Sequence, residues 1–102
     1  MKRYDKLVRD GIPAIIERSG RRCVVRVLGA QEYVERLDQK LQEELNEYLV
    51  DGSIEELADL VEVIRAAAIA RGSTWEALEA VRIKKLHERG GFAKRWLLVE
   101  SE

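Results

Sequence analysis

The stretch that most constrains the fold is residues 40–62, KLQEELNEYLVDGSIEELADLVE, in which clustered acids alternate with leucines and valines. Its acids fall at helical spacing, because Glu44 and Glu47 are three residues apart, and so are Glu56 and Asp59. Residues three apart lie on one face of a helix, so each pair presents its carboxylates side by side. A short turn signal separates the two pairs. If that turn folds the two helices antiparallel, both pairs meet across one groove.

Carboxylates gathered in one groove repel one another, so positive charge must lie nearby. A divalent cation that prefers oxygen ligands, Mg²⁺ or Mn²⁺, suits such a set. Two other interpretations compete with a metal site. Acids on helices commonly form solvated faces, and Ser53 with Glu56 matches a capping box. Against these, Glu44 and Glu56 share helix sectors with apolar side chains, where an acid is costly unless it is paired or bound to a metal.

Composition narrows the class of protein. A chain of 102 residues forms one domain, residues 1–102, and 46% hydrophobic content suits a helical domain that also buries an interface. The net charge is −1 although 36% of the residues are charged, which argues against a nucleic-acid polymer as partner. The single cysteine, Cys23, excludes an internal disulfide. With no signal-peptide pattern and no long apolar run, we expect a cytoplasmic protein that does not bind membranes.

Hydrophobic periodicity predicts a mainly α fold. The expected helices are residues 13–18, 31–50, 54–71 and 74–88. Gly52 is expected to end the second helix and Ser53 to cap the third, while Ser73 and Glu76 match a capping box before the fourth. Two apolar runs are predicted as strands of a minor two-stranded β element, residues 23–28 (CVVRVL) and 92–100 (FAKRWLLVE).

Three motifs in this chain resemble those of one superfamily. The sequence EELNE followed by EELAD resembles the EExxE…ExxD signature of the all-α nucleoside triphosphate pyrophosphohydrolases, which include the MazG-like enzymes, the phosphoribosyl-ATP pyrophosphohydrolases and the dimeric dUTPases. The opening, YDKLVRDGIPAIIE, and the ending, HERGGFAKRWLLVE, resemble the YxKLVRDxIPxII and RGGFxKR motifs of a small MazG-like branch, often described as phosphoribosyl-ATP pyrophosphohydrolase-like. Together the motifs cover nearly the full length. Gly11 and Ala14 depart from the pattern, because members often carry charged residues there.

The resemblance implies a MazG-like helical bundle that assembles as a homodimer or, as a dimer of dimers, a homotetramer. It implies Mg²⁺, with Mn²⁺ as a substitute, held by Glu44, Glu47, Glu56 and Asp59. The implied substrate is a (d)NTP or related nucleotide, cleaved between the α- and β-phosphorus to a monophosphate and pyrophosphate. Removal of non-canonical nucleotides, or house-cleaning, is one role for such a hydrolase.

The reaction needs a carboxylate to deprotonate the attacking water, and Glu43 and Glu47 are both candidates. It also needs basic side chains to neutralise the leaving pyrophosphate. The candidates for that role are Lys6, Arg9, Lys84, Lys85 and Arg89. The last three have an alternative role, because basic residues also complement the negative end of a helix.

Two functions other than catalysis fit the same residues. One is a non-catalytic helical module that dimerises or binds a protein partner, its acids being solvated or capping. The other is a nucleotide sensor that uses the same site without turnover. Substitution of Glu44 or Asp59 separates a metal site from a set of surface acids, because only a site loses metal binding.

Overall fold

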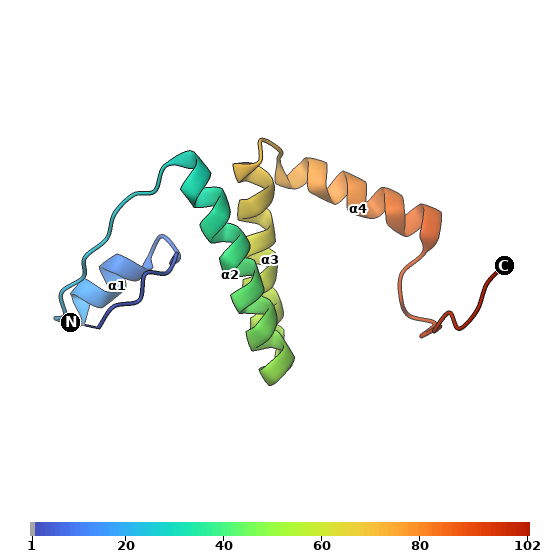
Figure 1. Ribbon diagram of the computed structural model, residues 1–102, viewed down its shortest axis with the longest axis horizontal. Helices are drawn as coiled ribbons and strands as arrows, with labels where there is room; N and C mark the ends of the chain where they lie inside the picture. The colour runs from blue at the N-terminus through green and yellow to red at the C-terminus, as the bar shows by residue number, and fades with distance from the viewer. Residues whose placement is uncertain (1) are drawn as a thin grey trace.

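The computed structural model describes residues 2–102 and consists of helices joined by irregular segments (Figure 1). The helices are α1 (Ile12–Arg18), α2 (Ala30–Asp51), α3 (Ile54–Ala70) and α4 (Trp75–Arg89). The predicted mainly α class is therefore confirmed, and every helix end lies within one residue of its predicted position. None of the described helices has the length and apolar character needed to cross a membrane.

The helices α2 and α3 lie side by side as an antiparallel hairpin (Figure 1). Gly52 ends α2 in the left-handed conformation, with φ of 69°, and its N–H donates to the carbonyl of Tyr48 at 2.7 Å. Glycine adopts this conformation without a side-chain clash. The Ser53 side chain then accepts a hydrogen bond from the Glu56 N–H at 3.3 Å and begins α3. Both predicted caps are confirmed, and together they set which residues of α3 face α2.

The predicted cap of the fourth helix is wrong by one residue. The N-cap of α4 is Thr74, whose hydroxyl accepts from the Ala77 N–H at 3.0 Å. Ser73 instead belongs to the preceding turn, because its N–H donates to the carbonyl of Ala68 at 2.9 Å. An N-cap residue typically has an extended backbone conformation, and Thr74 has one, with φ of −134° and ψ of 162°.

The predicted two-stranded β element is also wrong. Neither residues 23–28 nor residues 92–100 form a strand, and the two segments lie at opposite ends of the molecule (Figure 1). Both are open to solvent; Val27 is 97% exposed and Val99 is 81% exposed. Strand propensity depends on packing against a neighbouring strand, and within residues 2–102 neither segment reaches the other.

The interior of the molecule lies between α2 and α3. Leu37 on α2 is 3% exposed, and half-buried Leu41, Leu60 and Ile64 pack around the same seam. Glu44 lies in this seam as well, two turns after Leu37, and is 6% exposed. By contrast, α4 projects away from the hairpin at the end of α3 (Figure 1). The hairpin therefore holds the core, and Glu44 is buried in that same core.

Candidate metal centre

The structure brings the acids of α2 and α3 together in two overlapping groups. One group is Glu43, Glu44 and Glu47, and the other is Glu44, Glu56 and Asp59. Within each group, one carboxylate oxygen from every member lies within 4.8 Å of the others. Glu44 belongs to both groups, so it joins the acids of the two helices into one cluster.

Glu44 is the member whose position is hardest to explain without a ligand. It is 94% buried, and its Oε2 atom has no hydrogen-bond partner among the described residues. The Oε2 atom of half-buried Glu56 also lacks a partner there. A buried polar group left without a partner costs about 1–3 kcal/mol, and more when it is charged. Two such oxygens in one cluster distinguish these acids from a fully solvated surface.

The pKa of Glu44 also reflects its burial. Burial raises the pKa of its carboxyl above the usual range, and the negative charge of Glu47 raises it further. Lys40 acts in the opposite direction, since its Nζ lies 3.4 Å from Glu44 Oε1 and 3.6 Å from Glu43 Oε1. Because the net pKa shift is upward, Lys40 only partly offsets the cost of ionising Glu44.

Lys40 was not predicted as a site residue. Its signal was present in the sequence, because a lysine four residues before Glu44 lies on the same helix face. The sequence pattern placed Glu44 beside apolar side chains but did not show how deeply it is buried, and this burial makes a nearby positive charge important.

The N-terminal segment supplies two further cations to the cluster. Lys6 Nζ lies 3.1 Å from Glu43 Oε1, and Arg9 Nη2 lies 2.6 Å from Asp59 Oδ1. The segment is held there partly by Arg36 on α2, whose Nη1 donates to the carbonyl of Asp5 at 2.8 Å. Of the two basic residues predicted from the opening motif, Arg9 therefore lies on a predicted metal ligand, and Lys6 lies on Glu43, a predicted candidate for the base.

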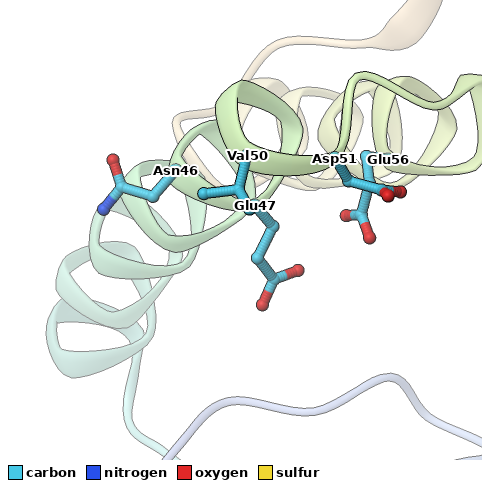
Figure 2. Close-up of a pocket in the computed structure, with 5 residues that line it drawn as sticks. All are labelled: Asn46, Glu47, Val50, Asp51 and Glu56. Atoms are coloured by element: carbon cyan, nitrogen blue, oxygen red, sulfur yellow. The ribbon is translucent and has the colours of Figure 1, made fainter.

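A shallow pocket of about 360 Å³ opens beside the cluster (Figure 2). Its lining residues are Asn46, Glu47, Val50, Asp51 and Glu56. The carboxylates of Glu47 and Glu56 extend to the same side of the helix pair. Asp51, the last residue of α2, adds an acid that was not predicted, since its place in the turn signal suggested only a structural role.

The remaining predicted basic residues lie elsewhere in the chain. Lys84, Lys85 and Arg89 are on α4, which projects away from the hairpin (Figure 1). Lys84 Nζ lies 3.9 Å from Glu88 of the same helix, and Arg89 occupies the last turn. That position suits the alternative role, in which a basic residue complements the helix end. Within one chain, the predicted cations placed on the acidic cluster are Lys6 and Arg9.

The chain is similar over part of its length to one uncharacterized protein. The chain is 52% identical over 42 residues to an uncharacterized protein of Mycolicibacterium smegmatis (strain ATCC 700084 / mc(2)155). The matched region is 41% of this chain and 43% of the relative, so the chain matches less than half of the relative's length. No protein family and no solved structure matches the chain.

Proposed function

We propose that the protein is a Mg²⁺-dependent nucleotide pyrophosphohydrolase that cleaves a (d)NTP or a related nucleotide into a monophosphate and pyrophosphate. The observation that carries the proposal is the buried, unpartnered oxygen of Glu44 at the junction of two carboxylate groups. A buried acid in that position can bind a metal ion, and without a partner it lowers the stability of the fold. The resemblance of the chain's motifs to those of MazG-like enzymes supports the same function.

The donor set fits Mg²⁺. Glu44, Glu56 and Asp59 form one group of carboxylates, and Glu47 joins Glu44 in the other group. All four offer oxygen ligands only, which this hard cation prefers, and two of the four have an oxygen with no partner among the described residues. Bound there, Mg²⁺ would neutralise the carboxylates, admit a triphosphate and lower the pKa of a coordinated water.

The geometry favours Glu47 over Glu43 as the general base. Glu43 already accepts from Lys6 and lies within 3.6 Å of Lys40, so its negative charge is largely engaged. Glu47 is exposed and lines the pocket, where its carboxylate can take a proton from an attacking water.

Lys6 and Arg9 are suited to bind phosphate. Arg9 lies on the proposed metal ligand Asp59 and Lys6 on the neighbouring Glu43, and both basic side chains are more than half exposed. A cation that neutralises Glu43 and Asp59 frees these side chains, and a nucleotide phosphate then offers them new acceptors.

The test is pyrophosphate release from a panel of canonical and modified (d)NTPs with Mg²⁺, with Mn²⁺ and with EDTA. We expect metal-dependent release together with the matching monophosphate. Glu44→Gln and Asp59→Asn should each lower turnover at least about 100-fold, more than the 10–100-fold typical of residues that only support a ligand. Glu62→Gln is the matched control, because this acid is exposed on α3 and makes no ion pair within the described residues.

Calorimetry with Mg²⁺ alone separates the competing functions. Mg²⁺ binding that Asp59→Asn abolishes, combined with no release from any nucleotide, would replace catalysis by the sensor function. No Mg²⁺ binding at all would leave a helical interaction module, and the metal site would be wrong.

A further inference from the structure

Positive and negative charge are divided unevenly along the chain. Residues 2–29 carry eight lysines and arginines against three acids, whereas the hairpin, residues 30–70, carries three against eleven. Opposite charges attract, so the N-terminal part supplies positive charge to the hairpin. The turn before α1 is where this part comes near the hairpin (Figure 1).

Polar contacts at the start of α2 attach the N-terminal part to the hairpin. Among the described residues, α1 packs against no other helix. The Arg26 guanidinium donates two hydrogen bonds to the Glu32 carboxylate, at 3.1 and 2.8 Å. One turn later on α2, Arg36 donates to the carbonyl of Asp5 at 2.8 Å. These contacts close residues 5–26 into a loop that is anchored on the first turns of α2.

The segment that leaves this anchor and reaches the acids is residues 5–9, referred to below as the strap. Asp5 bends the chain, with φ of 47°, a left-handed conformation that residues other than glycine adopt rarely. Beyond the bend, Lys6 pairs with an acid of α2 and Arg9 pairs with an acid of α3. The strap therefore crosses from one helix of the hairpin to the other, over the acidic cluster.

The strap is attached loosely to the cluster. The Lys6 and Arg9 side chains are 54% and 56% exposed, and ion pairs this open to water contribute little stability and are screened by salt. A hollow of about 40 Å³ also remains between the strap and α2. A cation that binds several acids of the cluster at once can therefore displace the strap.

We propose that the strap is an autoinhibitory contact, which competes with a divalent cation for the acidic cluster and is released when the cation binds. The inference rests on the metal site of the proposed function. Arg9 and the metal both use the Asp59 carboxylate, and two cations at one carboxylate repel each other. Because linkage is reciprocal, loosening the strap should tighten metal binding by the same factor by which the metal loosens the strap.

Arg36 is the positioning residue of this device. By holding the Asp5 carbonyl, it keeps Lys6 and Arg9 at a high effective concentration beside the acids. It contacts none of the proposed metal ligands itself among the described residues; its ion pair is with Glu32, at 3.7 Å.

A supporting strap is the competing arrangement. In it, Lys6 and Arg9 hold the carboxylates in place through one oxygen while the metal binds the other, so loosening the strap would weaken metal binding. Lys40 favours competition, because it makes a third basic side chain on the cluster and each of the three repels an arriving metal. The two arrangements predict opposite signs for one measurement.

Limited trypsin digestion followed by mass spectrometry tests release of the strap. Trypsin must take up the Lys6 side chain to cleave after it, so the rate of this cleavage follows the released population. We expect saturating Mg²⁺ to raise it at least about threefold relative to cleavage after Arg22. Arg22 is the internal standard, because it is exposed and makes no ion pair within the described residues.

Arg36→Gln tests the coupling while leaving Lys6, Arg9 and every acid in place. In EDTA it should raise cleavage after Lys6 about fivefold, and by calorimetry it should tighten Mg²⁺ binding about fivefold, the factor for one lost hydrogen bond. Arg71→Gln is the charge-matched control, because Arg71 pairs with Asp38 on the opposite side of α2 from Arg36, at 3.0 Å. It should change both quantities less than about twofold.

Weaker Mg²⁺ binding by Arg36→Gln would overturn competition in favour of a supporting strap, and equal effects of Arg36→Gln and Arg71→Gln would reduce the coupling to general electrostatics. If circular dichroism shows Arg36→Gln unfolded, Asp5→Pro should give the same changes, because proline cannot adopt the bend and the residue is exposed.

Failure of the strap and failure of the proposed function give different results. Mg²⁺ that binds without raising cleavage after Lys6 would overturn the strap alone. Mg²⁺ that raises this cleavage, with no turnover of any nucleotide, would support the strap and overturn catalysis alone. No Mg²⁺ binding by wild type would overturn both.

Discussion

The two faces of the α2–α3 hairpin share one helical register and differ in chemistry. The acidic face holds the carboxylates of Glu44, Glu47, Glu56 and Asp59, while the apolar face holds Leu45, Leu49, Leu57 and Val61. Both faces arise from the same repeated pattern, in which a seam glutamate is followed by a leucine and then by a second acid. One turn between two similar helices therefore creates two opposite surfaces.

Each face is incomplete in a different way. The apolar face lacks cover, and the accessible surface of the chain measures this deficit. On the acidic face, Lys6, Arg9 and Lys40 each lie on an acid, but one oxygen of Glu44 and one of Glu56 have no hydrogen-bond partner among the described residues. The two deficits are connected through the seam, because the packing that buries Leu37 also removes water from Glu44. Burial that stabilises the fold thus raises the energy of the acid that we assign to the metal.

The largest effect that tests the acidic face is the loss of its N-terminal cations. Lys6→Ala combined with Arg9→Ala should reduce nucleotide turnover about 10- to 100-fold, because two groups that neutralise phosphate are removed. The same double variant should bind Mg²⁺ at least as tightly as wild type, since Glu43 and Asp59 lose the cations that compete with the metal. Steady-state kinetics and calorimetry measure the two effects separately.

Arg21→Ala combined with Arg22→Ala is the charge-matched control, since it removes the same charge from an exposed segment beyond α1. If both double variants lose turnover equally, the effect is general electrostatics and the assignment of Lys6 and Arg9 fails. A larger loss in Lys84→Ala combined with Lys85→Ala would instead place the phosphate contacts on α4.

Much of the hairpin was predictable because its signals are local. The caps at Gly52 and Ser53 and the helical spacing of the acids depend on residues close in sequence, so the pattern alone places both acid pairs on facing helices. The strand at residues 23–28 was wrongly predicted because its formation needs a distant partner, which the chain does not bring to it. The helical pattern placed Glu44 beside apolar side chains, but the extent of its burial and the contact of Arg9 with Asp59 were out of reach, since both depend on tertiary packing.

A smaller effect comes from the lysine that supports the seam. Lys40→Met should destabilise the metal-free protein by about 1–3 kcal/mol, because Glu44 then loses its nearest positive charge while staying buried. Saturating Mg²⁺ should remove most of this difference by supplying the charge. Urea unfolding with EDTA and with Mg²⁺ measures it. Lys84→Met is the control, because Lys84 is exposed and should change stability by less than about 0.5 kcal/mol in either condition. An equal loss with and without Mg²⁺ would mean that Lys40 acts by packing alone.

The smallest effect has an unusual sign, since removing an acid should stabilise the protein. Because the pKa of Glu44 is raised in the fold, ionising it is disfavoured there relative to the unfolded chain, whose carboxyl has the usual value of 4.5. The penalty is absent below that value, grows as the pH rises toward the raised pKa, and is complete above it. In EDTA at neutral pH, Glu44→Gln should therefore be more stable than wild type by about 1 kcal/mol, and the gain should disappear as the pH falls below 4.5.

Other carboxyls do not change the difference in stability between wild type and Glu44→Gln. Hydrogen bonds from Arg26 and Arg82 lower the pKa of Glu32 and Glu79, so these pairs are lost on acidification, but they are present equally in both proteins and cancel in the difference. Mg²⁺ should reverse the order of stability, because wild type then gains binding energy that the glutamine variant has lost. Thermal unfolding across pH, with and without Mg²⁺, measures both trends, with Glu62→Gln as the control. A glutamine variant less stable than wild type in EDTA at neutral pH would show that Lys40 already satisfies Glu44, and the acidic face would then need no metal to explain it.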